Sequence, residues 1–406
     1  MGKGAFCPFF CTMKMRWESR KVAYVGLCVF ILAAIAVTLK LWFAAPLSIK
    51  DISFNVAAYN NFLIFKWAGF NFLNELPLYI SNDPLHYDLF KYSPTCALAF
   101  VPLSWLPTGL GLLLWNLVNM ILPLWALNQI IGLNKAAKNI LAIWLLGEGI
   151  TSLLNVQSNG LVLGLLLGSI ASFQRDKNGL TVLLILLAGF IKIFGWIFFL
   201  LFLLKPKSIP KAALYGLSYG GMLVLAPLLC VNASYLISEY RWWLLLLKHD
   251  SGTYIKLSFM GWFQSWFSIV PPKNVVLFAA LAIQIVPLFW LYRAAKRSGQ
   301  VHTQLIQFGA SLLVWVVLFN HMAESATYVI AVGGIVLFFS GEAQERRWPA
   351  WTVLTLVMLF SVLGPTDIYP KELRYWIVET AQLKAFAVLT AYVYMIWSLL
   401  RNKALA

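Results

Sequence analysis

Apolar stretches long enough to cross a membrane recur along the whole chain, and they constrain its fold more than any other feature. Such runs appear repeatedly between Val22 and Leu400. Each has roughly 17 to 25 residues, enough to span a hydrocarbon core of about 30 Å as a helix. Runs such as LLILLAGF and FFLLFLLK are apolar on every side, whereas the strands of a membrane barrel alternate apolar and polar residues. The sequence therefore predicts an all-α polytopic membrane protein, with one transmembrane domain over residues 1–406.

The charged residues agree with this prediction. Only 11% of the residues are charged, against about 25% in a soluble domain, which excludes a soluble enzyme. The net charge of +16 does not indicate a nucleic-acid partner, because the basic residues form short clusters between apolar runs, as the positive-inside rule describes. We therefore expect a multi-pass protein of the inner (plasma) membrane with both termini in the cytoplasm. The five cysteines follow no disulfide or zinc pattern, so no metal or cofactor is expected.

A first span over Val22 to Ala45, preceded by basic residues, places the following segment outside the cell. The expected external segments are residues 48–94, 232–274 and 365–382, of which the first two are the larger. About 12 transmembrane helices are predicted, within a range of 10–12.

The topology of residues 93–204 is open between two arrangements. In one, residues 93–107 cross the membrane and 180–204 form a complete span, which gives twelve spans in all. In the other, 93–107 only dip into the membrane and 180–204 break near Lys192 and Gly195 into a re-entrant pair. Span length favours the first arrangement, and the positive-inside rule favours the second. The charges whose side depends on this choice are Lys135, Lys138, Arg175 and Lys177.

Asp51 stands just beyond the first span, in KDISFNV. A carboxylate at this membrane boundary can meet both a lipid-borne and a water-borne substrate, which is where a general base for such a pair is useful. Capping of the next helix by the same side chain is the structural alternative.

His321 and Glu324, in LFNHMAESATY, form a second candidate pair. If the turn is helical, residues three apart share a face, and the carboxylate can orient the imidazole as a proton acceptor. A histidine that caps a helix end is the alternative.

Basic residues among apolar neighbours are candidates to bind an anionic head group. Lys192, in GFIKIFGWIF, is costly within a membrane unless it has a function or a partner. Arg241 and Lys256 lie among aromatic residues, where basic side chains bind phosphate or simply anchor a surface helix. Gln157 and Asn159, in NVQSNG, can bind sugar hydroxyls or terminate two helices.

In the order of these segments the chain resembles glycosyltransferase family 87, the polyprenol-phosphate-mannose-dependent mannosyltransferases of the C-type glycosyltransferase superfold. The resemblance covers most of the first 210 residues and rests on the succession of motifs rather than on any single one. These motifs are Asp51, LPLY (76–79), FKYSPTCALAFVPLSWLP (90–107), LWNLVN (114–119), VQSNGLVLGLL (156–166) and IKIFGWIFFLLFLLK (191–205).

The resemblance implies about twelve helices and a catalytic Asp in the first external loop. The expected activity is transfer of a hexose, mannose in the first instance, from a polyprenyl phosphate to a glycolipid or glycan hydroxyl outside the cell, without metal. Asp51, or His321 with Glu324, would provide the base; Lys192, Arg241 or Lys256 would bind phosphate; Tyr92, Gln157 and Asn159 would contact sugar or acceptor. The partners are then the lipid donor, the acceptor and membrane lipids. A transporter or flippase, or a polymerase or ligase of polyprenyl-linked glycans, is the alternative.

Overall fold

We describe a computed structural model of the chain, which covers residues 8–48, 54–80, 85–253, 257–298, 301–341 and 348–401. Helices dominate, and within these ranges the β structure is an isolated bridge between Leu47 and Val56. Seven of the described helices are long and apolar enough to cross a membrane on their own. The predicted all-α, multi-pass membrane fold is therefore confirmed at this level.

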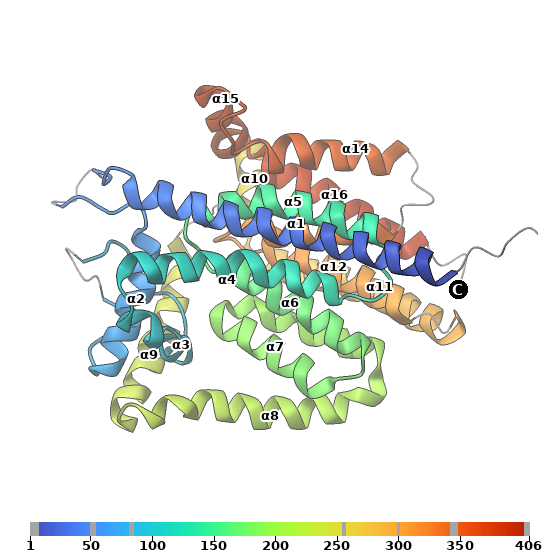
Figure 1. The fold of residues 1–406 in the computed structure, drawn as a ribbon. Coiled ribbons are helices and arrows are strands. Elements are labelled where there is room, and N and C mark those ends of the chain that lie inside the picture. Colours follow the sequence, from blue (N-terminus) through green and yellow to red (C-terminus); the bar gives the residue numbers. More distant parts are fainter. Residues whose placement is uncertain are drawn as a thin grey trace, which may run out of the picture.

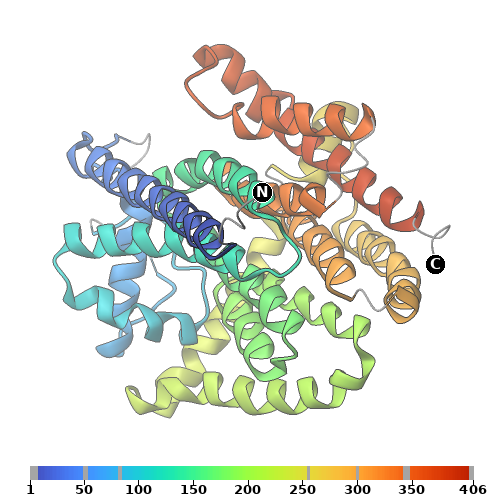
Figure 2. The ribbon, with the colours of Figure 1, turned by 45° about the vertical axis from the view of Figure 1, so that its right-hand side comes forward.

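Long helices run side by side along one direction of the molecule (Figures 1 and 2). They are α1 (Pro8–Phe43), α4 (Thr108–Gln129), α5 (Lys135–Leu154), α6 (Asn159–Gln174), α7 (Asn178–Ile191), α8 (Ile209–Leu225), α11 (Lys273–Ser298), α12 (Val301–Leu318), α13 (Tyr328–Gly341), α14 (Trp348–Leu356) with its π-helical continuation (Val357–Val362), and α16 (Leu383–Arg401).

A second group of helices lies towards one end of these long helices, which we call the loop end (Figure 1). They are α2 (Asn60–Leu73), α3 (Pro94–Trp105), α9 (Ala233–Thr253), α10 (Phe259–Phe267) and α15 (Lys371–Tyr375). The remaining elements are short 3₁₀ turns at Pro206–Ser208, Ala226–Leu229 and Ser325–Thr327, a 3₁₀ helix at Ile193–Leu204 and a π turn at Trp376–Thr380.

The opposite end, which we call the basic end, carries the charges whose side the sequence leaves open. Lys205, Lys207 and Lys211 form one of the short basic clusters expected in the cytoplasm. The Lys205 ammonium lies 2.6 Å from a carboxylate oxygen of Asp176, so Arg175 and Lys177 lie beside this cluster. The Gln174 side chain bonds both backbone groups of Ile131, which brings the α4–α5 connection to the same end. The arrangement favoured by the positive-inside rule is the one that the structure has.

The arrangement in which residues 93–107 cross the membrane and residues 180–204 form one continuous span is therefore not the one observed. α3 has 12 residues and at 1.5 Å per residue is only about 18 Å long, too short to cross a hydrocarbon core. It packs along α2 at the loop end instead, so closely that a Cβ on Gly69 would lie 2.5 Å from the Phe100 carbonyl oxygen. Apolar composition alone made residues 93–107 resemble a span.

The segment 180–204 turns back on itself. α7 ends at Ile191. The next residue, Lys192, has an extended backbone (φ −137°, ψ 113°), and the 3₁₀ helix Ile193–Leu204 follows. The returning chain lies so close that a Cβ on Gly195 would be 2.9 Å from the backbone of Ala188. This is the re-entrant pair of the second arrangement, and it leaves the Lys192 side chain at the break rather than inside a continuous span.

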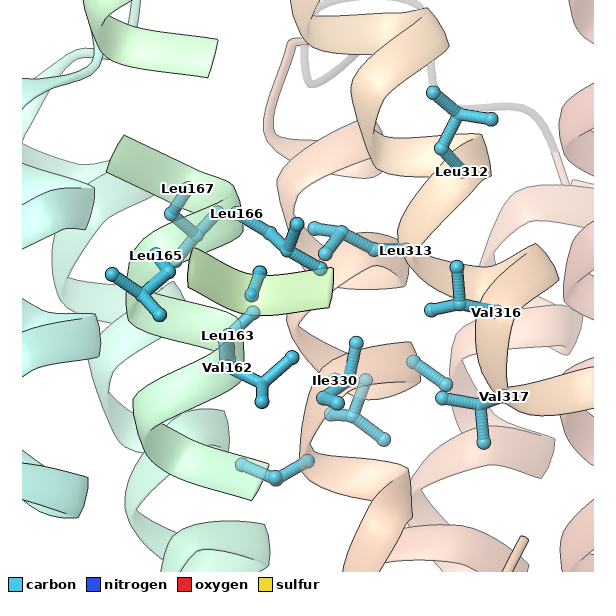
Figure 3. Close-up of a cluster of buried hydrophobic side chains, with 14 of the residues drawn as sticks. Val162, Leu163, Leu165, Leu166, Leu167, Leu312, Leu313, Val316, Val317 and Ile330 are labelled. Atoms are coloured by element: carbon cyan, nitrogen blue, oxygen red, sulfur yellow. The ribbon is translucent and has the colours of Figure 1, made fainter. Parts of the chain in front are cut away.

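The core lies where α6 meets α12 and α13, and Figure 3 shows its leucine, valine and isoleucine side chains. α6 is buried along its whole length. Lipid is as apolar as leucine, so helices in a membrane associate through close packing at small residues. Gly160 and Gly164 provide this contact, since a Cβ on them would meet the Asn119 carbonyl oxygen at 2.0 Å and Leu122 at 2.6 Å. α6 is thus held tightly against α4, and its first residue is fixed at the loop end.

Candidate active site

A cavity of about 480 Å³ opens at the loop end of the bundle. Its walls come from α2, the segment before α3, the turn before α6, the break after α7, α9 and the turn between α12 and α13. The polar residues that line it are Asn61, Asp88, Lys91, Tyr92, Gln157, Lys192, Asn320, His321, Glu324 and Thr327. Five residues proposed from the sequence (Tyr92, Gln157, Lys192, His321 and Glu324) are therefore brought into one space.

Lys192 enters this cavity from the break after α7. The ammonium donates a hydrogen bond of 2.5 Å to the side-chain oxygen of Asn159, and it lies 6.0 Å from the centre of the Phe194 ring. The break supplies the room that this contact needs, because a continuous α7 would carry the side chain along the helix surface. An intramembrane lysine is tolerated where it finds such a polar partner.

Asn159 and Gln157 continue the contact across the cavity wall. The Asn159 amide nitrogen donates to the Gln157 oxygen at 2.8 Å, and the Gln157 amide nitrogen donates to a carboxylate oxygen of Glu324. Four side chains from three separate parts of the chain thus form one continuous series. Sequence reasoning selected all four but did not join them.

The turn that carries His321 and Glu324 is not helical, so the condition under which these residues would share a helix face is not met. Residues 319–324 form turns and irregular backbone, closed by bonds from the Met322 and Ala323 amides to Asn320. Glu324 precedes the 3₁₀ turn Ser325–Thr327 as its N-cap. His321 and Glu324 nevertheless line the same cavity, so both remain within reach of a common ligand.

Tyr92 closes the cavity beside α3. The Ser158 hydroxyl donates to the Tyr92 phenol oxygen at 3.2 Å, and the Tyr79 hydroxyl donates to the Tyr92 carbonyl at 2.7 Å. Burial raises the pKa of the Tyr92 phenol, so the group stays protonated and can donate a hydrogen bond to a ligand.

Sequence reasoning missed Asn61, Asp88 and Lys91 as cavity residues. Asp88 adopts a left-handed backbone (φ 72°) and pairs with Lys91 at 3.4 Å. Asn61 donates to the Asn155 carbonyl at 2.7 Å. A polar residue in a long external loop carries no signal of its own, although strain at a non-glycine residue is frequent at functional sites.

One wall of the cavity is apolar. Ile191, Ile193 and Phe194 flank Lys192, and Trp243 and Leu247 face the space from α9. α9 is fixed across the loop end by Glu239, which accepts from the Leu78 amide at 2.9 Å, and by the Tyr235 hydroxyl, which donates to the Leu76 carbonyl at 2.8 Å. The cavity therefore offers a cation beside an apolar surface on one side and polar groups on the other.

Four predicted site residues are not among those that line this cavity. Asn159 is fully buried in its wall, where it bonds Lys192 and Gln157. Arg241 is exposed on α9 and does not line the cavity. Asp51 and Lys256 lie outside the described residues. Among the residues that the structure describes, no group of three histidine, cysteine, aspartate or glutamate side chains could hold a metal ion.

Comparison with known proteins identifies the family to which the chain belongs. No curated protein matches the chain. The model of glycosyltransferase family 87 matches residues 90–366, which is more than half of the 406 residues and includes most of the cavity walls. The chain belongs to glycosyltransferase family 87 and is a membrane glycosyltransferase.

Proposed function

We propose that this protein transfers a hexose, mannose in the first instance, from a polyprenyl phosphate to a hydroxyl of a glycolipid or glycan. The reaction takes place on the non-cytoplasmic face of the inner (plasma) membrane. The observation that carries the proposal is the two-sided cavity, in which Lys192 lies beside Ile193 and Phe194 while His321 and Glu324 line the same space. A substrate with a lipid part, an anionic link and a sugar matches that distribution.

The donor requires stabilisation of its leaving group. When the bond between the anomeric carbon and the phosphate oxygen breaks, negative charge grows on a polyprenyl phosphate. An ammonium fixed in a site of low dielectric stabilises that charge as it develops. Lys192 is the group that we assign to this role, and the apolar wall formed with Trp243 and Leu247 suits the first isoprene units. Arg241, exposed on α9, fits an anchor at the membrane surface better than a phosphate ligand.

The acceptor requires removal of a proton. As the acceptor oxygen attacks an oxocarbenium-like anomeric carbon, a base takes its proton, and a single displacement inverts the configuration. We propose Asp51 as the base or as the group that orients the acceptor, with His321 as the alternative. Tyr92, which also lines the cavity, is placed to donate a hydrogen bond to a sugar or acceptor oxygen.

The test is transfer of label by the purified protein from radiolabelled polyprenyl-phosphate mannose to a membrane lipid extract. We expect a labelled product, its near-complete loss in Lys192→Met, and strong loss in either Asp51→Asn or His321→Ala. Lys207→Met, at the basic end, is the matched control and should transfer normally.

Two outcomes overturn the proposal. If wild-type protein transfers sugar from none of a panel of polyprenyl-phosphate hexoses, the donor class is wrong. If the same protein instead moves the intact lipid across vesicles, it acts as a transporter.

A further inference from the structure

The amides of Gln157 and Asn159 are occupied by each other and by two charged groups. The Lys192 ammonium donates to Asn159, Asn159 donates to Gln157, and Gln157 donates to the Glu324 carboxylate. Each amide thus uses its oxygen towards the lysine and its nitrogen towards the glutamate. We call this series the amide relay.

The relay has one possible direction. An ammonium only donates hydrogen bonds and a carboxylate only accepts them, whereas an amide accepts at its oxygen and donates at its nitrogen. Two amides placed between the charges therefore satisfy both ends only in the observed orientation. The end bonds are assisted by charge, and hydrogen bonds in series polarise one another. Reversing either amide would set donor against donor or acceptor against acceptor.

The middle of the relay is fixed by packing. Asn159 is fully buried and begins α6, whose next residue, Gly160, lies against the Asn119 backbone. The Leu161 amide donates to the Asn119 side chain at 2.9 Å, which fastens the same turn to α4. The backbone of Asn159 therefore holds its place whether or not the cavity is filled, and its side-chain amide takes its orientation from Gln157.

We propose that Gln157 and Asn159 are positioning residues that set the separation and orientation of the Lys192 ammonium and the Glu324 carboxylate, rather than residues that read the sugar. The inference rests on the proposed function for its activity assay. It assigns Glu324 a fixed place opposite the phosphate-binding lysine, so that a donor bound at Lys192 meets the acceptor side of the cavity in one geometry. A misplacement of about 1 Å at such a site can cost about a hundredfold in rate.

The two roles predict different kinetics. Residues that read sugar hydroxyls change the discrimination between hexoses, and their effects multiply when both are removed. Members of a single relay lower the rate for every hexose by the same factor, and removing the second member after the first has little further effect.

The experiment measures kcat and KM with two polyprenyl-phosphate hexoses for Gln157→Leu, Asn159→Leu and the double variant. We expect kcat to fall about 10- to 100-fold in each, equally for both sugars, with the double variant close to the worse single one. A change in sugar preference of tenfold or more, or multiplied losses in the double variant, would overturn the relay.

Gln157→Glu is a second variant that tests the relay even if Gln157→Leu does not fold. It keeps the size of the side chain but presents an oxygen to the Glu324 carboxylate in place of the amide donor, so its transfer rate should fall as far as that of Gln157→Leu. A normal rate in Gln157→Glu would also overturn the relay. Gln174→Leu is the matched control, because Gln174 lies on α6 and bonds Ile131 with both ends of its amide, far from the cavity. It should leave kcat and KM unchanged.

A measurement independent of activity separates failure of the relay from failure of the proposed function. Acylation of Lys192 by a water-soluble amine reagent is followed by mass spectrometry, with Lys91 on the same cavity as internal reference. Gln157→Leu should raise Lys192 labelling several-fold, because Asn159 loses the partner that orients it. Unchanged labelling would reject the relay even if wild-type protein transfers no sugar.

Discussion

Two lysine–glutamate arrangements meet at consecutive residues of one turn. Glu324 ends the relay that starts at Lys192. Ser325, the next residue, accepts a hydrogen bond of 3.1 Å from Lys384, which also lies 3.1 Å from both carboxylate oxygens of Glu148. The relay borders a cavity, whereas both Lys384 and Glu148 are 0% exposed.

The difference indicates what each arrangement is for. In the buried pair the charges touch, and Ser361 donates a further bond of 3.0 Å to Glu148, so the polar groups are satisfied without a ligand. In the relay two amides separate the charges, and the ends at Lys192 and Glu324 both line the cavity. The first arrangement stabilises α5, α16 and the turn, and the second is open to a substrate.

The largest effect on stability should follow from breaking the buried pair on one side. Lys384→Met leaves the Glu148 carboxylate buried without its cation, which typically costs about 3–5 kcal/mol. Chemical denaturation in detergent would measure this loss in the free energy of unfolding. Replacing both partners, as Glu148→Met with Lys384→Met, should recover most of it, because two apolar side chains need no partner. A double variant as unstable as the single one would show that Glu148 and Lys384 stabilise the protein by more than compensating each other's buried charge.

Lys192→Met should have the opposite profile. The lysine borders the cavity rather than the closed core, so we expect a smaller loss of stability, about 1.5 kcal/mol, the lower end for a hydrogen bond to a charged group. Sugar transfer should fall about 10²- to 10³-fold, as when one group that stabilises developing charge is removed. Unfolding and transfer measured on the same preparation test this. A Lys192→Met protein as unstable as Lys384→Met would remove the distinction between the two arrangements.

Gly160→Ala should have an intermediate effect on both measurements. Its new methyl group would lie 2.0 Å from the Asn119 carbonyl oxygen, so α6 must move away from α4. Such overpacking typically costs about 1–3 kcal/mol, and the movement also displaces Asn159 within the relay. Gly216→Ala on α8 is the control, since nothing lies within 4 Å of its added Cβ. Normal transfer by Gly160→Ala would mean that the relay tolerates movement of α6.

The sequence predicted an all-α membrane fold because long apolar runs follow from general rules of membrane insertion. It did not decide between the topologies because α3 is as apolar as a span but has only 12 residues, and its ends are hard to locate without a structure. The spacing of Gly160, Gly164 and Gly168 carried a packing signal that was not used.

The site was predicted as separate groups but not as a whole. Lys192 and Glu324 each stand out as a charge among apolar neighbours, yet nothing in the sequence places them opposite one another. The positions of residues around α9 could have corrected the prediction that Arg241 binds phosphate. Trp243 and Leu247 are four residues apart on one face of α9, whereas Arg241 lies about 200° from Trp243. The Glu148–Lys384 pair was missed because each residue lies in a different span and only packing joins them.

The smallest expected effect on stability is that of replacing Glu75, whose side chain is exposed to solvent at the loop end. Its oxygen accepts bonds of 2.7 Å from both the backbone and the side chain of Asn232, and these bonds lower the pKa of Glu75 below its usual 4.5. A carboxyl group whose pKa is lower when folded stabilises the protein above its unfolded pKa, and that contribution disappears as the pH falls through the folded value. Thermal unfolding in detergent should therefore show wild type slightly more stable than Glu75→Gln above about pH 4.5, with the difference vanishing in more acidic buffer. A stability difference that is the same at every pH would show that Glu75 stabilises the protein independently of its charge.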